Sequence, residues 1–544
     1  MKAMRGEGDT LRERRPGPED FQLLPEGLSE ARRVASLELL DEYLSEQKAN
    51  FLGYQADQQL NYQKELAKYL DCQLNNLGDP YKDGNFTLNT KMMERAVVDY
   101  YAQLWNAKPY NPDDPESSWG YVLSMGSSEA NLYGLWNARD YLAGKYLLGE
   151  TEEDAWRASL REGSARVDGG AIVRRVTEFS ETNALSPVLF YSEDTHYSII
   201  KSAIVLRLKT FYEMGNQYYP GECRFSWANG EWPRAVPSEG GPGGPGSMDI
   251  EKLADLVDFF ASKKHPILIN FNYGTTFKGA YDNVEAAGKC LLPIFKKHGL
   301  LTRKVYYDPD NSKRYDNRSG YWFHVDGALG AAYMPFIEKA YEMGLSDLRP
   351  YRFDFSLPFV HSIAMSGHKW IGAPWPCGVY LTKRKYQLLP PDSPEYIGAL
   401  DSTFAGSRNG LSAFILWNYL ARNSYDKQIK KALYTQRIAE YAYRRLKHLE
   451  EKLRRDLWVD RSPLSLTVRF KQVKPEIVSR YSLSGETFYV NGQRKAYNHI
   501  FAMSHVTEET IDRLIEDLGK PGAFPKQNVE ANSSTLKASA DLSG

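Results

Sequence analysis

Four polar segments, each directly after an apolar run, carry residue types that together suit the binding of a flat phosphorylated ring. The first is Gly126-Ser127-Ser128, which opens a helical pattern. Small residues at a helix start let backbone N–H groups and hydroxyls approach a phosphate, and the helix dipole adds to the attraction. An ordinary helix cap uses the same residues, so this segment alone leaves both interpretations open.

The next two segments supply an imidazole and a carboxylate. His196 lies in EDTHYS, where it is placed either to stack on a ring or to face solvent from a loop. Asp326 ends the run WFHVD, and a buried carboxylate needs a charged partner such as a pyridinium nitrogen, which then makes the ring an electron acceptor. Ala328 is small enough to let a ring lie against the chain. A metal pair of His324 and Asp326 on one strand face is the alternative, although no third ligand is evident.

The fourth segment, SGHKWIG, places Lys369 just beyond a predicted strand. A lysine at a buried strand end is poorly solvated, which lowers its pKa and suits its amine to form a Schiff base. The alternative is a lysine that extends its amine into solvent. In this order, the four segments indicate a site that holds a ring by its phosphate, its face, its nitrogen and its aldehyde.

β-rich runs alternate with helical patterns over the central third of the chain, and several of the runs are almost wholly apolar. This is typical of parallel strands covered on both faces, so the sequence predicts an α/β domain with a mostly parallel central sheet. Ligands of such sheets bind at the carboxyl ends of the strands, where the four polar segments fall. The predicted strands are 121–125, 188–192, 267–271, 322–326, 362–366 and 379–382.

The composition changes along the chain predict five parts. Both ends are polar and predicted to be disordered, and a helical segment precedes the large domain. The parts are a disordered extension at 1–28, an N-terminal helical segment at 29–110, a large α/β domain at 111–410, a small α+β domain at 411–519 and a disordered tail at 520–544. Three insertions interrupt the pattern, at 149–186, 213–247 and 308–320. The second ends in SEGGPGGPGS, which predicts a surface loop without helix or strand.

The overall charge excludes some classes of partner. With 68 basic and 69 acidic residues the net charge is −1, which offers no basic excess for nucleic acid or an anionic membrane. No apolar run approaches the roughly 18 residues needed to cross a bilayer. The charged start of the chain lacks the apolar stretch of a secretory signal, and the four cysteines are scattered. We therefore expect a cytoplasmic protein without membrane, nucleic-acid or metal partners.

Over roughly residues 60–520 the sequence resembles the group II pyridoxal-phosphate decarboxylases, a fold-type-I family. It is most similar to the branch of bacterial histidine decarboxylases and plant histidine and serine decarboxylases. The most specific segments are HVDGA at 324–328 and SGHKWIGAPWPCG at 366–378. The others are NNLGDP (75–80), GSSEAN (126–131), THYS (195–198), NYGTTFKGAYD (272–282), PEYIGALDSTFAGSRNG (394–410) and AMSHVTEETID (502–512).

The resemblance implies that pyridoxal 5′-phosphate is the cofactor and that Lys369 carries it as a Schiff base. Asp326 then pairs with the pyridine nitrogen, His196 stacks on one face of the ring and Ala328 packs on the other. The remaining cofactor contacts that it implies are Ser127 and Ser128 at the phosphate, Ser366 and His368 close to it, and Thr275 on the side of the 3-hydroxyl group.

Members of this family are homodimers whose sites use both chains. The resemblance therefore implies that Ser407 reaches the phosphate in the other subunit. It also places Tyr396 on a mobile loop, from which a tyrosine donates a proton to the substrate. The implied catalytic set is Lys369, Tyr396, His196 and Asp326.

The implied reaction is the decarboxylation of an L-amino acid to the amine and CO₂, with histidine as the first candidate substrate. Aromatic amino acids, serine and acidic amino acids are alternatives, because GSSEAN replaces the G-T-E-G-N form usual in the histidine branch and looks more like glutamate decarboxylases. Decarboxylating aldehyde synthases are a rival class, which Tyr396 disfavours because those relatives carry Phe there. A non-enzymatic binding protein on the same fold is disfavoured by the joint presence of Lys369, Asp326 and His196.

Overall fold

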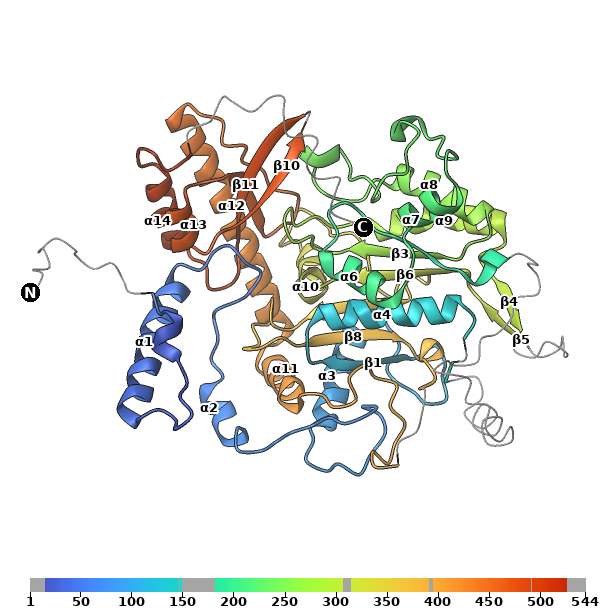
Figure 1. Ribbon diagram of the computed structural model, residues 1–544, viewed down its shortest axis with the longest axis horizontal. Helices are drawn as coiled ribbons and strands as arrows, with labels where there is room; N and C mark the ends of the chain where they lie inside the picture. Colours follow the sequence, from blue (N-terminus) through green and yellow to red (C-terminus); the bar gives the residue numbers. More distant parts are fainter. Residues whose placement is uncertain are drawn as a thin grey trace, which may run out of the picture.

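A six-stranded sheet with the strand order β1-β8-β7-β6-β3-β2 forms the centre of the molecule (Figure 1). The computed structural model describes residues 15–145, 147–148, 182–306, 315–390, 395–490 and 492–525. Strands β2, β3, β6 and β7 pair in parallel, whereas β8 is antiparallel to both β7 and β1. Only β8 therefore runs against the others, and the predicted mostly parallel α/β sheet is confirmed. The strands are β1 (Ser118–Leu123), β2 (Val188–Phe190), β3 (Ile267–Asn272), β6 (Tyr321–Asp326), β7 (Ser362–Ser366) and β8 (Gly378–Lys383).

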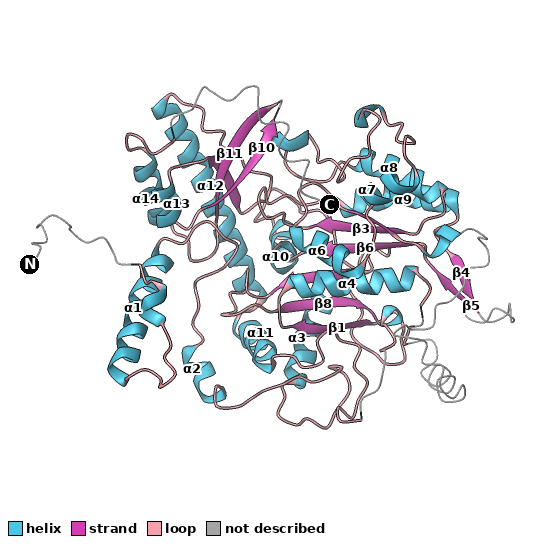
Figure 2. Ribbon diagram, viewed as in Figure 1, coloured by secondary structure: helices cyan, strands magenta, loops and turns pink. Residues whose placement is uncertain are grey.

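The six strands predicted from apolar runs are the six strands of this sheet. Every residue of β1, β2, β3, β6 and β7 is buried, because helices pack around the sheet (Figure 2). Burial on both faces is what makes such strands read as continuous apolar runs. The prediction for β1 starts three residues late and runs past its end, where the chain turns toward a helix.

A helix follows each of the strands β1, β2, β3 and β6, and the N-termini of these helices lie at the same edge of the sheet. The connecting helices are α4 (Ser127–Leu142), α6 (Tyr197–Leu206), α7 (Phe211–Tyr218), α8 (Ile250–Ser262), α9 (Val284–His298) and α10 (Gly330–Glu342). Helix α4 is held at its C-terminal end by two buried arginines. Arg318 donates to the carbonyl of Tyr141 at 3.1 Å, and Arg303 donates to that of Leu142. Cations at this end favour the helix dipole, so they steady the helix whose other end carries Ser127.

The two arginines belong to a small hairpin formed by β4 (Arg303–Tyr306) and β5 (Tyr315–Arg318). The predicted polar insertion at 308–320 thus contains a strand in its second half, and its residues 308–314 lie outside the described residues. Residues 149–181 of the insertion at 149–186 also lie outside the described residues. The insertion at 213–247 contains the end of α7 and two short 3₁₀ helices, Ser226–Ala228 and Gly241–Gly243. Loop therefore dominates it, as predicted, but the glycine-rich stretch also makes one 3₁₀ turn.

The C-terminal part is a small α+β unit beside the N-terminal helix (orange to red in Figure 1). It has a three-stranded sheet of order β10-β11-β9, packed against the long helix α12. No helix in the described part of the chain is long and apolar enough to cross a membrane. The elements from the end of the large domain onward are α11 (Gly410–Arg422), α12 (Tyr425–Leu453), β9 (Thr467–Lys471), α13 (Pro475–Arg480), β10 (Ser484–Val490), β11 (Gln493–Phe501) and α14 (Glu508–Leu518).

The N-terminal segment is only partly helical. Its helices are α1 (Glu30–Ala49), the single turn α2 (Gln63–Leu66) and α3 (Lys91–Leu104), and residues 50–62 and 70–90 contain none. Part of the predicted disordered extension has structure: Pro18–Phe21 form a 3₁₀ turn, and the Ser36 hydroxyl donates to the carbonyl of Asp20 at 2.6 Å. Residues 1–14 and 526–544 of the two predicted disordered ends lie outside the described residues.

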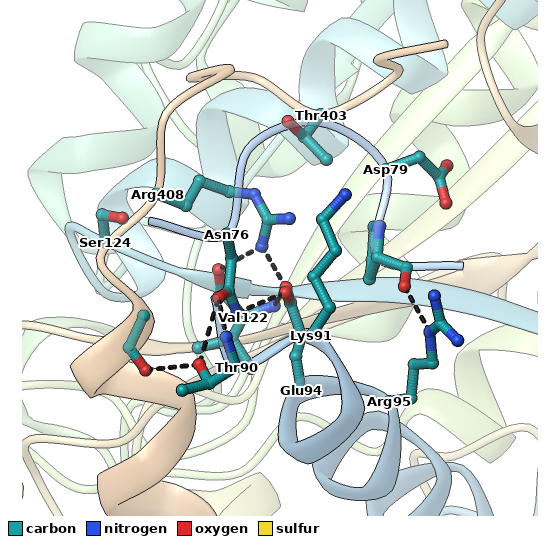
Figure 3. A network of polar contacts seen from close by, with 12 residues as sticks. Asn76, Asp79, Thr90, Lys91, Glu94, Arg95, Val122, Ser124, Thr403 and Arg408 are labelled. Atoms are coloured by element: carbon teal, nitrogen blue, oxygen red, sulfur yellow. Dashed lines mark hydrogen bonds and ion pairs between the residues drawn. The ribbon is translucent and has the colours of Figure 1, made fainter. Parts of the chain in front are cut away.

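A buried ion pair fastens the loop at 395–410 to the N-terminal segment (Figure 3). The Arg408 guanidinium donates to the Glu94 carboxylate of α3 and, at 2.7 Å, to the carbonyl of Gly78. Glu94 also accepts from the amide of Asn76 and from the backbone N–H of Val122, each at 2.8 Å. The pair is almost fully buried, with side-chain exposures of 1% for Arg408 and 0% for Glu94. The loop carries Tyr396 and Ser407, two of the predicted site residues, and this network anchors it at Arg408, next to Ser407.

We expect Glu94→Ala to lower the free energy of unfolding by about 3–5 kcal/mol, because it leaves the buried Arg408 charge without its partner. Denaturant unfolding followed by fluorescence measures the change. The matched control is Glu338→Ala, which removes an exposed pair with Arg349 and should cost less than about 1 kcal/mol. Equal losses of unfolding free energy in the two variants would show that the buried Glu94–Arg408 pair stabilises the protein no more than an exposed pair does.

Candidate active site

A cavity of about 220 Å³ opens where the parallel strands end, and it collects nine of the predicted site residues. They come from segments far apart in the sequence that the sheet brings to one edge, as expected for an α/β fold. These nine are Ser127, Ser128, His196, Thr275, Asp326, Ala328, Ser366, His368 and Lys369.

The turn into α4 forms one end of the cavity. Gly126 has φ 68, and a Cβ there would lie 2.5 Å from His368 Cε1, so the position requires glycine. The N–H of Ser127 donates to Ser366 Oγ at 3.1 Å, and the Ser366 hydroxyl donates to Ser127 Oγ at 2.9 Å. Hydroxyls and a helix N-terminus thus meet at one point, which suits a phosphate.

Lys369 lies just beyond β7, and two distant segments hold the backbone around it. The N–H of Asp57 donates to the carbonyl of Lys369 at 3.2 Å, and the Lys431 ammonium donates to that of Trp370 at 2.6 Å. Asp57 and Lys431 form an ion pair with each other at 2.9 Å. Burial lowers the pKa of the Lys369 amine, while Asp326 acts in the opposite direction. A buried amine with a lowered pKa is a stronger nucleophile at neutral pH.

Asp326 ends β6 and faces the cavity. Its Oδ2 accepts from the amide of Asn131 at 2.8 Å, and its Oδ1 accepts from the N–H of Ala328 at 3.2 Å. The neighbouring His324 is fully buried, and both of its ring nitrogens are engaged, with Asn131 and Ser362. Among the described residues no third His, Cys, Asp or Glu joins this pair, so the metal alternative gains no ligand set.

His196 is the N-cap of α6 and projects toward the cavity. Its Nδ1 is hydrogen-bonded to the Ser198 hydroxyl at 2.8 Å. Burial lowers the pKa of His196, with a further lowering by Lys369 and an opposing effect of Asp326. His196 is therefore mostly neutral near pH 7, as suits an imidazole that lies flat on a ring.

Thr275 lies on a tight loop after β3. Its Oγ1 accepts from the N–H of Ala280 at 2.9 Å, and the loop is tied to the segment of His196 by the ion pair of Lys278 and Asp194, 3.0 Å apart. Both partners are nearly inaccessible to solvent, with side-chain exposures of 1% and 6%. Two of the cavity walls are thereby joined to each other.

Tyr396 and Ser407 do not line the cavity of this chain. The Tyr396 side chain is 73% exposed, and Ser407 is exposed with its Oγ accepting from the amide of Asn75 at 3.1 Å. The roles that the resemblance implies for both residues require a cavity other than their own, and they stay predictions.

Sequence reasoning missed seven lining residues: Met125, Asn131, Ser198, Asn272, Gly274, Thr276 and Pro376. Asn131 is the most informative, because it lies one helical turn beyond Ser127 and Ser128 and therefore on the same face of α4. The helical spacing was a usable signal for it. Asn272 ends β3 at the edge where ligands bind, which was a second signal.

This donor set fits pyridoxal phosphate. Hydroxyls and a helix N-terminus suit the phosphate, a carboxylate suits a pyridinium nitrogen, and a buried lysine amine suits an aldehyde. Ala328 lines the cavity, and its small side chain leaves space for a ring.

Comparisons of the chain with known proteins agree with this chemistry. A family model described as the pyridoxal-dependent decarboxylase conserved domain matches residues 242–451. The histidine decarboxylase of Solanum lycopersicum is 27% identical over 478 residues, covering 88% of this chain and 86% of that protein. Serine decarboxylase 2 of Oryza sativa subsp. japonica is 27% identical over 480 residues, covering 88% and 76%.

Solved structures give a closer relation. The L-methionine decarboxylase of Streptomyces sp. 590, solved in its internal aldimine form, is 44% identical, with a TM-score of 0.85 over 93% of this chain and 98% of that chain. The glutamate decarboxylase of Lactobacillus brevis has a TM-score of 0.57 at 17% identity over 93% and 97% of the two chains, a likeness of fold. Identity and coverage at the level of the Streptomyces enzyme establish that this chain belongs to the group II pyridoxal-phosphate decarboxylases, as a fold-type-I, pyridoxal-phosphate-dependent amino acid carboxy-lyase.

Proposed function

We propose that this enzyme decarboxylates L-methionine, or a similar unbranched apolar L-amino acid, to the amine and CO₂. The observation that carries the proposal is the much higher identity to the Streptomyces L-methionine decarboxylase than to the histidine and serine decarboxylases. Histidine, the first candidate from the sequence, is the second substrate to test, because the curated relatives include histidine decarboxylases.

The lining of the cavity supports an uncharged substrate side chain. The charged side chains that line it are Asp326 and Lys369, and both have roles toward the cofactor in this proposal. No arginine or further lysine lines it among the described residues, so an acidic side chain would lack a cationic partner in this chain. Met125 and Pro376 add apolar surface to the lining. A thioether can pack on such surface without a hydrogen-bonding partner.

The cofactor, when bound, supplies an aldehyde that joins the substrate amine and a ring that accepts the electron pair left on the α-carbon when CO₂ departs. In this proposal Lys369 would hold the aldehyde carbon of the cofactor, and the lowered pKa of its amine would favour the unprotonated, nucleophilic form. Asp326 would hold the ring nitrogen, and His196 and Ala328 would enclose the ring. Tyr396 Oη delivers a proton to the substrate α-carbon, the part of a general acid.

We infer that the enzyme is a homodimer in which Tyr396 and Ser407 serve the partner's site. Both residues lie outside the cavity of their own chain, and the Glu94–Arg408 network holds their loop in place. The outer face of α6, which directly follows His196, is apolar and exposed: Tyr197 is 60% exposed, and Ile204 and Val205 are each 70% exposed. An exposed apolar face beside an active site is typical of a protein–protein contact, and a second copy would cover it.

Borohydride reduction of the holoenzyme should place a stable pyridoxyl label on Lys369. Peptide mapping by mass spectrometry locates the label. Lys278 is the internal control, because its buried ammonium is paired with Asp194. A label on Lys278 or on any other lysine would contradict the assignment.

Release of ¹⁴CO₂ from each of the twenty carboxyl-labelled amino acids tests the substrate. We expect the highest kcat/KM with L-methionine, and Lys369→Ala provides the blank. One methylene in an apolar pocket is worth roughly 10–200-fold in such discrimination, so shorter and branched analogues should react more slowly. A preference for histidine would contradict methionine as the substrate but would agree with an amino acid decarboxylase.

Mixing Lys369→Ala chains with Tyr396→Phe chains tests the shared site. Each substitution alone should remove most activity, and Tyr396→Phe should cost roughly 10²–10⁴-fold while cofactor stays bound. After dissociation and reassociation, about one quarter of the parental activity should return, because random pairing makes half of the dimers mixed and each mixed dimer has one intact site. If both residues acted within one chain, mixing would restore nothing.

A further inference from the structure

Asn131 joins the two sides of the predicted cofactor site through one amide group. It lies on α4 with 1% of its surface exposed. Its two N–H bonds donate to Asp326 Oδ2 at 2.8 Å and to Ser198 Oγ at 3.1 Å, and its carbonyl lies 3.1 Å from His324 Nε2. Both donors and the carbonyl are thus engaged, and none is left for the backbone of α4.

The orientation of this amide follows from its partners. Reversing the amide would turn its carbonyl toward the carboxylate of Asp326, so the NH₂ group must face Asp326 and the carbonyl must face His324. His324 Nε2 then carries a proton. Burial lowers the pKa of His324 to about 4, so the ring is neutral and its Nδ1 accepts from the Ser362 hydroxyl at 2.8 Å. Ser362 in turn accepts from the indole N–H of Trp322 at 3.0 Å, which can only donate.

The second N–H of Asn131 fixes His196 in the same way. Ser198 Oγ accepts this N–H, so its own proton points to His196 Nδ1 at 2.8 Å. The N–H of Ser198 also points to Nδ1, at 3.3 Å. Nδ1 is therefore an acceptor, and the proton of the neutral His196 ring is on Nε2.

We propose that Asn131 is a positioning residue that fixes both the accepting oxygen of Asp326 and the tautomer of His196, and that His324 orients its amide. The inference rests on the proposed placement of Asp326 and His196 at the nitrogen and the face of the cofactor ring. Its consequence is that Asp326 and His196 do not adjust independently, since one amide bonds to Asp326 directly and to His196 through the Ser198 hydroxyl.

A glycine in α4, Gly134, leaves the space that the His324 ring occupies. Gly134 lies one turn beyond Asn131 and has an ordinary helical backbone, so conformational freedom does not explain the glycine. A Cβ at this position would lie 2.7 Å from His324 Cε1 and 2.8 Å from Nδ1. A methyl group there would push the imidazole away from the carbonyl of Asn131.

Asn131→Asp is the direct test, because it keeps the shape of the side chain and replaces its two donors by an acceptor. The introduced carboxylate faces Asp326 and attracts the Ser198 hydroxyl away from His196. Asp326, Lys369 and Lys201 are the charged groups that act on His196, and the substitution alters none of them directly. We expect the Kd for pyridoxal phosphate to rise roughly 10–100-fold, the factor for loss of a hydrogen bond to a charged group. The pH midpoint of the visible absorbance of bound cofactor should move by about one unit or more.

Asn137→Asp is the matched control. Asn137 lies on the same helix and is fully buried, but its amide bonds to the carbonyl of Tyr386 and the hydroxyl of Tyr380 instead of a residue of the cavity. Both substitutions should lower the Tm, whereas only Asn131→Asp should move the absorbance midpoint and the Kd. A midpoint and Kd equal to those of the parent would overturn the inference, and so would an equal shift in the Asn137 variant.

Gly134→Ala gives a second test that stands if Asn131→Asp does not fold. Gly134 does not line the cavity, and the three atoms nearest to its added Cβ all belong to His324, so a change of the same sign and smaller size is expected. Gly519→Ala is its control, since a Cβ there meets its neighbours at an ordinary 3.4 Å. An unchanged Kd and midpoint in Gly134→Ala would refute the orienting role of His324. If the parental protein binds no pyridoxal phosphate, the proposed function fails instead, which keeps the two outcomes apart.

Discussion

The parallel register between β6 and β7 is the constraint on which the rest of the site depends. It pairs Asp326 with Ala364, so that the chain beyond β7 carries Lys369 over the same edge at which β6 delivers its carboxylate. A carboxylate and an ammonium group in a low-dielectric site both lose hydration. The opposite charge of each partly compensates the other for that loss. The opposing influences on the pKa of Lys369, burial and Asp326, are the electrostatic result of that register. A slip by one residue would turn one of the two side chains to the opposite face of the sheet.

The sheet alone does not fix Lys369, because the segment after β7 is irregular. Its backbone is held instead by Asp57 before α2 and by Lys431 of α12, which also bind each other. Ser504 and His505, from the late segment AMSHVTEETID, close the cluster: both side chains lie against Asp57. The N-terminal segment and the small domain thus meet at the backbone around Lys369, the proposed Schiff-base lysine. This gives a physical reason for motifs that lie hundreds of residues from the site in sequence.

The parts of the site that could be predicted from sequence are those with local signals. Strands buried on both faces are continuous apolar runs, and the residues that follow them must meet at one edge, so nine site residues fell into one cavity. Asn131 was missed because a neutral amide within a helix carries no charge signal; its helical spacing from Ser127 and Ser128 could have placed it on the cavity side of α4, but its contacts with β6 and α6 come from the tertiary fold. Tyr396 and Ser407 were placed by resemblance, and the single chain leaves them outside its own cavity. The turn at Pro18–Phe21 was missed because a tertiary contact, from Ser36 to Asp20, helps to hold a segment whose composition predicts disorder.

The charge balance of the cavity also constrains how a phosphate is held. Of the charged or titratable side chains that line it, Asp326 and Lys369 are assigned to the ring in the proposed function, and burial lowers the pKa of both His196 and His368. Neutral imidazoles add no positive charge near pH 7. Under the proposed assignment, the described lining residues would hold the phosphate of the cofactor by dipoles: the N-terminus of α4 and the hydroxyls of Ser127, Ser128 and Ser366. Such groups bind an anion by geometry more than by net charge, so small displacements of α4 weaken it. The buried arginines at the opposite end of α4 matter for this reason, because a helix that cannot slide keeps its N-terminus aimed at the phosphate.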